Sequence, residues 1–173
     1  MAKKPPLTRT LIGPSGEHFV LSRLYQQGLL AALAPPGTPE VDVLVLSPDG
    51  KTIAATLQVK TSTRGAADGW QFAHKHETLV EERLFYALVD FKAQPTTVYV
   101  LPSRVVAEVV RRSHRAWLDS PGRSGGQHRD NPIRRLRAAS GVPGTDYPAG
   151  WMDEWKERWD LIVEEVEEAG AAE

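Results

Sequence analysis

VDVLVLSPDGKTIAATLQVK, residues 41–60, carries the strongest secondary-structure signal in this chain. It contains two apolar, β-branched runs, residues 41–46 and 52–60, which are typical of β-strands. The connector between them has turn chemistry. Pro48 sets φ for the first central position of a type I turn, and Gly50 can take the left-handed conformation of a G1 bulge. The sequence therefore predicts a β-hairpin.

The register of this hairpin decides which polar side chains share a face of the sheet. A bulged loop places Asp42 opposite Thr56. Gln58 and Lys60 then follow at steps of two, on the same face. A two-residue turn would place Asp42 opposite Ala55 and send Gln58 and Lys60 to the other face. Because Pro-Asp-Gly favours the bulged loop, we expect Asp42 and Gln58 to be diagonal neighbours about 7 Å apart. The alternative is an ordinary amphipathic hairpin whose polar face is solvated.

Five short motifs follow one another along the chain: Gly16-Glu17, Asp42, Gln58-Val59-Lys60-Thr61-Ser62, Tyr99-Val100-Leu101-Pro102 and Trp159-Asp160-Leu161-Ile162. Together they resemble the PD-(D/E)XK nuclease superfamily, in the Gln-x-Lys variant seen in Mrr-like restriction nucleases and in small prokaryotic members. The resemblance implies the restriction-endonuclease-like fold, an α/β sandwich with a mixed central sheet of about five strands flanked by helices.

Carried over by position, the resemblance implies four catalytic residues. Asp42 is the metal carboxylate, and Gln58 is a neutral oxygen ligand in the usual acidic position. Lys60 is the catalytic lysine, and Glu17 is the helical acid that completes the metal site. The chain departs from the family pattern at Gln58, and also where Glu40 instead of Asp follows the proline. Glu40 lies two residues before Asp42, so it is an alternative or accessory metal ligand.

The chemistry implied is metal-assisted hydrolysis of a phosphodiester bond. Mg²⁺, or Mn²⁺ in its place, prefers oxygen ligands and keeps several waters, so one or two carboxylates suffice to hold it. The metal would polarise the phosphate and activate water, while Lys60 would stabilise developing charge. We therefore expect an endonuclease, with DNA as the favoured substrate. The alternative is a degenerate module that keeps the fold and binds nucleic acid or a protein without cleaving. The resemblance also makes a homodimer a possible assembly.

Composition agrees with one small domain. The chain has 173 residues, of which 41% are hydrophobic, and no cysteine, which excludes disulfides and cysteine-ligated zinc. No apolar run approaches about 18 residues, and the first residues lack the hydrophobic segment of a signal peptide. We therefore expect a cytoplasmic protein without a membrane partner.

The domain prediction divides the chain into a folded body and two tails. We expect flexible tails at residues 1–6 and 169–173. The single domain between them, residues 7–168, has a core at about 15–117. A basic loop and a tryptophan-rich helix follow at 118–168.

Charge is distributed unevenly along the chain. Residues 104–137 hold nine arginines against three acids, a local balance of +6, and residues 146–173 hold ten acids against two bases, a local balance of −8. A basic segment of this kind can follow a phosphate backbone. The candidate contacts are Arg111, Arg112, Arg115, Arg129, Arg134 and Arg135. An equally weighted alternative is that the basic segment pairs with the acidic one, within the protein or across an oligomer.

The remaining elements follow from caps and periodicity. Ser15 is the expected cap of the first helix, which places Glu17 in the first turn and ends at Gly28. We expect residues 29–34 to form the first strand, followed by a turn at 35–37.

Further along, a short strand is expected at residues 70–72 and two longer ones at 84–91 and 96–101. A valine-rich helix follows Pro102-Ser103. The run His74-Lys75-His76-Glu77 suggests zinc only weakly, and a solvated connecting segment is favoured.

Trp151, Trp155 and Trp159 recur every four residues and predict one C-terminal helix with an aromatic face. Core packing explains that face better than base stacking does, because the opposite face of such a helix is acidic and would repel phosphates. We expect this helix to lie away from DNA.

Overall fold

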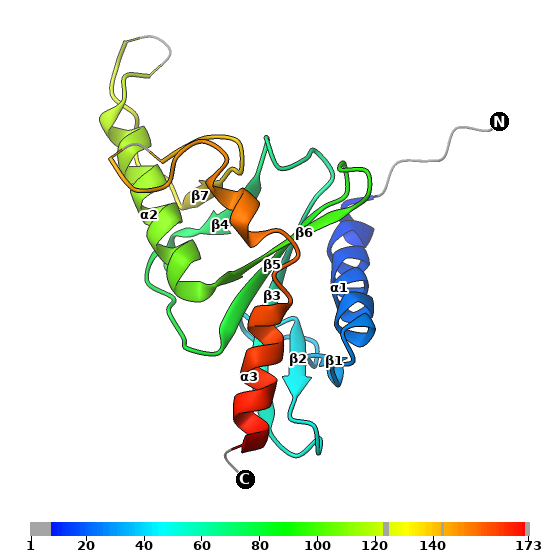
Figure 1. The fold of residues 1–173 in the computed structure, drawn as a ribbon. Helices are drawn as coiled ribbons and strands as arrows, with labels where there is room; N and C mark the ends of the chain where they lie inside the picture. Colours follow the sequence, from blue (N-terminus) through cyan, green and yellow to red (C-terminus); the bar gives the residue numbers. More distant parts are fainter. Residues whose placement is uncertain (1–7, 123–124, 143, 172–173) are drawn as a thin grey trace, which may run out of the picture.

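The computed structural model describes residues 8–122, 125–142 and 144–171. In these residues the chain forms a mixed five-stranded sheet with the strand order β1-β2-β3-β5-β6 (Figure 1). Its strands are β1 (Ala31–Leu33), β2 (Val43–Leu46), β3 (Ile53–Ser62), β5 (Leu84–Asp90) and β6 (Thr97–Pro102). Only β3 and β5 run parallel within this sheet, and helices cover both faces. The predicted α/β sandwich is therefore confirmed.

The hairpin of β2 and β3 forms, but its register differs from the predicted one. Val43 pairs with Leu57, so the register continues toward Asp42 at the level of Gln58 instead of Thr56. The loop is longer than expected because the Ser47 hydroxyl holds it, accepting from the Thr52 N–H at 3.1 Å. The irregularity lies between Val45 and Leu46, inside the strand.

The shift amounts to two residues, and a strand repeats every two residues, so the expected face of each β3 side chain is unchanged. The predicted conformation of Gly50 is also confirmed, with φ at +75°.

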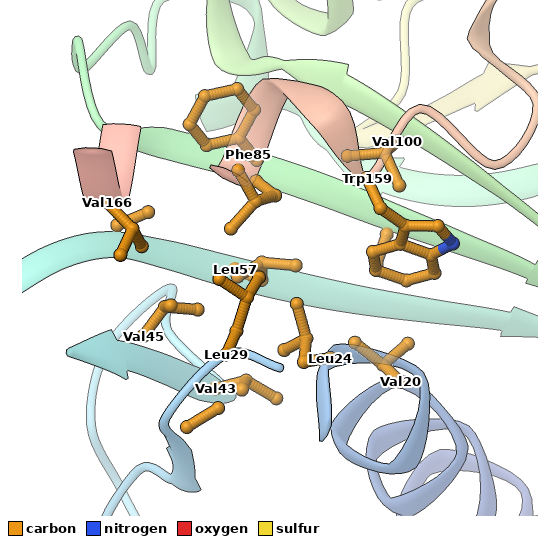
Figure 2. Packing of buried hydrophobic residues seen from close by; sticks show 14 of the residues in the cluster. Val20, Leu24, Leu29, Val43, Val45, Leu57, Phe85, Val100, Trp159 and Val166 are labelled. Carbon is orange, nitrogen blue, oxygen red and sulfur yellow. The ribbon is translucent and has the colours of Figure 1, made fainter. Parts of the chain in front are cut away.

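One face of the sheet is covered by α1 (Arg9–Gln26) and α3 (Asp160–Ala171). Val20 and Leu24 of α1 pack there with Leu57 of β3 and with Trp159 and Val166 (Figure 2). All five side chains are buried, so this layer forms a continuous apolar core between helices and sheet.

The first helix begins earlier than predicted. Thr8 occupies the N-cap position, and the helix runs through Pro14 to Gln26, so Ser15 is not its cap. Glu17 consequently lies in the middle of the helix, too far from the partial positive charge at the helix N-terminus to be stabilised by it. The expected end is confirmed, because Gly28 has a φ of +78° and follows the last helical turn.

The other face of the sheet carries α2 and a small second sheet. α2 (Ser103–Asp119) buries Val105, Val106, Val109 and Val110, as predicted. The second sheet pairs β4 (Trp70–Ala73) with β7 (Ile133–Leu136), and two 3-10 helices, η1 (His74–Glu77) and η2 (Trp151–Trp155), complete the layer. Together they enclose a second apolar core with the side chains of β5 and β6 that point to this face of the sheet.

The three tryptophans do not belong to one helix. Trp151 and Trp155 bound η2, whereas Trp159 precedes α3, and Glu157 between them has a positive φ of 51°. Trp151 is 5% exposed and packs in the apolar core on the α2 face of the sheet. Trp159 is 3% exposed and packs in the core on the α1 face. The predicted core packing is confirmed, while the single continuous helix is wrong because the chain changes face at Lys156.

The segment between η2 and α3 also protects the edge of the sheet. Lys156 forms a β-bridge with Tyr99 of β6, and the Glu157 N–H donates to the Val98 carbonyl at 2.8 Å. Backbone groups of an edge strand would otherwise offer a template for pairing with another chain.

The tail expected from residue 169 overlaps α3, which extends to Ala171, and Ala169 is 8% exposed. The other expected tail, residues 1–6, lies outside the described residues. Among the helices that the structure describes, none is long and apolar enough to cross a membrane.

Candidate active site

The candidate site is built on β3, whose alternation sends Gln58 and Lys60 to the face that carries α2. There they lie beside Tyr86 and Leu88 of β5, their partners in the parallel register. Tyr86 and Leu88 both belong to the second apolar core, on the face of the sheet that carries α2. Gln58 and Lys60 therefore project from the same face of β3, next to apolar side chains, as the predicted strand alternation requires.

Gln58 uses both ends of its amide and is 7% exposed. Its Nε2 donates to Glu40 Oε2 at 3.2 Å, and its Oε1 lies 3.1 Å from His76 Nε2. The amide orientation follows from these partners, because the reverse orientation would turn an oxygen toward the Glu40 carboxylate. Gln58 thus links the segment before β2 to η1, and its oxygen is not directed at open solvent.

The prediction of a solvated connection at residues 74–77 is wrong for His76, whereas His74 and Lys75 are exposed. His76 is 3% exposed, and its ring contacts Phe72 and Tyr86 edge to face. Burial lowers the pKa of His76, so the neutral imidazole is favoured. The neighbouring Lys75 forms an ion pair with Glu40. Sequence spacing missed these residues because their partners lie far away along the chain.

Glu40 sits in a strained backbone position, with φ at +60°, which few residues other than glycine adopt. Burial by itself would raise the pKa of its carboxyl, but hydrogen bonds from Lys75 and Gln58 outweigh this effect and lower the pKa. Its carboxylate also lies 3.4 Å from His76 Nε2. Glu40 is therefore the hub of a network that joins η1 to the sheet.

Asp42 and Glu17 form a second acidic group next to this network. Asp42 Oδ2 accepts a hydrogen bond from the Val59 N–H at 2.7 Å, which fixes the carboxylate against β3. Burial raises the pKa of Glu17, and the negative charge of Asp42 raises it further. Two carboxylates whose charges disfavour each other are the arrangement that a bound cation relieves.

Glu17 reaches this position because α1 approaches β3 closely at Gly16. A Cβ atom at Gly16 would lie 1.9 Å from Thr61 Oγ1, so only glycine fits there without a shift. Thr61 follows Lys60 directly on β3, and α1 lies on the face opposite to that of Gln58. Glu17 therefore approaches Asp42 from the α1 face of the sheet.

The charges of Asp42 and Glu40 both act on the Lys60 ammonium. Burial lowers the pKa of this ammonium, whereas the charges of Asp42 and Glu40 oppose that shift. Its Nζ is 6.0 Å from the centroid of the Phe72 ring. Both carboxylates thus favour the charged form of a lysine that is only partly open to solvent.

A polar cleft of about 270 Å³ opens at Lys60. It runs along the end of β3 and is walled by α1 on one side and by the β4–β7 sheet on the other. Besides Lys60, its charged residues are Arg64, Asp68 and Arg135. Three cations against one carboxylate, which itself lies 3.7 Å from Arg135, make the cleft positive and suited to an anion.

A divalent cation fits part of the predicted ligand set. Among the described residues, no three His, Cys, Asp or Glu side chains converge as a ready-made metal site. Asp42 and Glu17 supply two carboxylates, which is sufficient for a Mg²⁺ ion that keeps several waters. The amide of Gln58 is held by Glu40 and His76, so it does not fit the ligand role in this conformation.

The six candidate phosphate contacts have different environments. Arg111 and Arg129 are exposed, and Arg112 and Arg115 are exposed but paired with acids one helical turn away on α2. Arg134 is buried, with a side chain 2% exposed that pairs with Glu77 of η1, so it is unsuited to contact a phosphate.

The remaining member, Arg135, lines the cleft at Lys60. The alternative of pairing between the basic and acidic segments gains no support within the described ranges, because the ion pairs of these arginines go to Asp68, Glu77, Glu108, Asp119 and Asp130.

Comparison with protein-family models and with curated proteins finds no match. Among solved structures, the chain is similar to that of a bacterial homing endonuclease, I-Ssp6803I, with 12% sequence identity and a TM-score of 0.51. The similarity covers 96% of this chain and 99% of that one. Identity this low shows the fold alone. The chain therefore shares the α/β fold of that protein along almost its whole length.

Proposed function

We propose that this protein is a metal-dependent endonuclease that hydrolyses phosphodiester bonds, with DNA as its substrate. One observation carries the proposal: a partly buried lysine, Lys60, stands beside Asp42 at the head of a positive cleft. The fold shared with a homing endonuclease supports the same reading.

The residues of the cleft divide the work between binding and chemistry. Arg64 and Arg135 attract the phosphate backbone and hold it along the cleft. Lys60 donates to a phosphate oxygen and stabilises the charge that develops there, an interaction strengthened by its partial burial. Asp42 and Glu40 keep the ammonium protonated.

Asp42 and Glu17 would hold the divalent ion. Such an ion supplies an activated water and polarises the phosphate. Gln58 acts as a positioning residue in this proposal, because its two hydrogen bonds hold Glu40 and His76 in place beside Lys60.

The first test follows cleavage of supercoiled plasmid while Mg²⁺ or Mn²⁺ is titrated. We expect Asp42→Asn and Lys60→Ala each to reduce cleavage by at least about 100-fold, the range seen when a group that stabilises transition-state charge is removed. Asp153→Asn and Lys51→Ala are matched controls, since both residues lie on the exposed surface. The assignment is wrong if both site variants cut as fast as wild type.

A second candidate function is a non-catalytic module that binds nucleic acid or a protein partner. The engagement of Gln58 favours it, because one expected metal ligand is occupied by protein groups. This reading predicts salt-sensitive DNA binding that survives Asp42→Ala and shows no turnover with either metal. Metal-dependent cleavage by the wild type excludes it.

The proposal extends to assembly. One Lys60 cleft per chain can address one strand at a time, so a double-strand cut requires two chains or two successive events. We propose a homodimer for duplex cleavage. Light scattering with the DNA bound, together with the order in which nicked and linear plasmid appear, tests this: a monomer that accumulates nicked plasmid would contradict it.

A further inference from the structure

A second groove lies between the C-terminal half of α2 and β7. It encloses about 610 Å³, a volume typical of small-ligand sites. Its described lining comes from α2 and Ser120 after it, from Asn131 and the β7 strand that follows, and from residues 137–141 beyond β7. The lining residues are Ser113, His114, Ala116, Trp117, Ser120, Asn131, Ile133, Arg135, Arg137, Ser140 and Gly141. None of the proposed catalytic residues belongs to it.

The groove offers an aromatic platform. Trp117 is 37% exposed although tryptophan is usually well buried. Two rings already lie against its indole: His114 at 5.3 Å and 30°, and His128 at 4.1 Å and 24° between centroids and planes. Ile133 across the groove is 51% exposed. The site therefore presents a stack of planar rings with an apolar neighbour.

The charge of the groove is positive. Arg135 and Arg137 are lining residues, and the described lining holds no carboxylate. Two acids lie at its margin: Asp130, which is exposed, lies 2.7 Å from His114, and Asp68 lies 3.7 Å from Arg135. Planar rings combined with guanidinium groups are the usual means of binding an unpaired nucleotide, whose base stacks while its phosphate pairs.

Arg135 connects the two sites, because it lines both this groove and the cleft at Lys60. A strand whose phosphate contacts Arg135 can thus place one nucleotide at Lys60 and a neighbouring segment at Trp117. A paired duplex keeps its bases stacked on one another and cannot offer a free base to the indole.

We propose that the α2–β7 groove binds an unpaired segment of the nucleic-acid strand. One base joins the stack at Trp117, and the flanking phosphates pair with Arg135 and Arg137. This inference rests on the proposed function for its substrate class and extends it, because it assigns preference for a strand with unpaired bases next to the cut site.

The test measures binding by fluorescence anisotropy, in the Asp42→Asn background so that no cleavage intervenes. The probes are a labelled oligothymidine and a blunt duplex of the same length. We expect Trp117→Ala to weaken oligothymidine binding by about tenfold and blunt-duplex binding by less than about twofold. Trp117→Phe, which retains an aromatic ring, should recover most of the affinity.

Arg137→Ala provides a second, independent variant. It should weaken oligothymidine binding and lower the slope of log affinity against log salt by about 0.7, the value for one phosphate contact on a single strand. The controls are Tyr25→Ala, which removes an exposed aromatic ring from α1, and Arg104→Ala, at the other end of α2. Neither should change binding.

The inference is overturned if Trp117→Ala binds oligothymidine as tightly as its parent, or if oligothymidine and duplex lose affinity equally. Cleavage of plasmid and of single-stranded DNA by the wild type is measured in parallel and reports on the proposed function alone. If the wild type cleaves DNA but Trp117→Ala does not change binding, the proposed nuclease function stands and the proposed role of the groove is wrong. If binding depends on Trp117 but the wild type does not cleave, the proposed strand binding in the groove stands and the proposed nuclease function is wrong.

Discussion

The sequence resemblance implies an acid at position 58, and the surroundings of Gln58 explain why an amide is suited to this position. The Nε2 group donates to Glu40, which an acid at position 58 could not do. We expect Gln58→Glu to destabilise the metal-free protein by about 1–3 kcal/mol, because it removes this donor and sets two carboxylates against each other. Thermal unfolding measures the loss.

Mg²⁺ should stabilise Gln58→Glu more than it stabilises the wild type, since the variant offers an additional carboxylate and binding to the folded state raises its stability. Gln94→Glu, at an exposed position of the loop between β5 and β6, is the control for the charge change. Equal stability of Gln58→Glu and wild type without metal would show that the Glu40 hydrogen bond contributes nothing.

A pH effect is expected at Glu165 on α3. Burial raises the pKa of this carboxyl, the negative charge of Glu168 adds to the rise, and Arg83 opposes it. An acid whose pKa is higher in the folded state destabilises the fold once it ionises, so this cost is absent below about pH 4.5 and appears as pH rises.

Glu165→Gln should therefore raise the melting temperature at pH 7 and leave it unchanged at pH 4. Glu167→Gln, at an exposed site on the same helix, serves as the control. A gain at pH 4 as large as the gain at pH 7 would contradict the electrostatic cause.

At the scale of elements, the position of α1 depends on one close approach. Gly16→Ala places a methyl group 1.9 Å from Thr61 Oγ1, so α1 or β3 must shift. We expect a loss of about 1–3 kcal/mol, as for other overpacked sites. A chemical-denaturation curve measures it, and cleavage should fall as well because Glu17 moves with the helix.

Gly170→Ala in α3 is the control. Its Cβ would lie 3.5 Å from Pro48 Cδ, an ordinary contact, so the higher helix propensity of alanine should stabilise the protein by up to about 1 kcal/mol. Opposite signs for the two alanines are the expected result. A more stable Gly16→Ala variant would mean that the space between α1 and β3 at Thr61 can hold a methyl group, which would contradict the prediction.

The elements that the sequence predicted well are those whose local pattern agrees with the tertiary structure. The strands at 84–91 and 96–101 and the valine face of α2 fall into this class, because apolar spacing and burial coincide. The start of α1 differs from the prediction because a cap at Ser15 leaves Pro14 outside the helix, whereas the structure accommodates Pro14 inside it.

The site was predictable only where its residues are close in the chain. Gln58 and Lys60 share a face because strand alternation requires it. The partners Lys75 and His76 depend on how η1 packs against the sheet, which no local pattern encodes. The four-residue spacing of the tryptophans likewise imitates a helix although two of them serve different cores.

At the scale of the molecule, the two cores share one sheet, so the protein should unfold as a unit. We expect Trp151→Ala and Trp159→Ala each to cost about 3–5 kcal/mol, as for other large buried aromatic side chains. Each variant should still show one transition, with near- and far-ultraviolet circular dichroism changing together.

The contrasting variant is Trp117→Ala, whose parent side chain is 37% exposed and should contribute far less to stability. Two separate transitions in either core variant would show that the layers on the two faces of the sheet fold independently.

The crossing at Lys156 and Glu157 has a consequence for biosynthesis. The layer beneath α1 stays open until Trp159, Ile162 and Val166 arrive, because these side chains fill it from the far end of the sequence. A nascent chain lacking residues 159–169 exposes the apolar side of β3 and β5 while it is still on the ribosome. Chaperone dependence during synthesis should therefore end abruptly once this segment emerges, and ribosome-bound intermediates stalled before it should be the aggregation-prone ones.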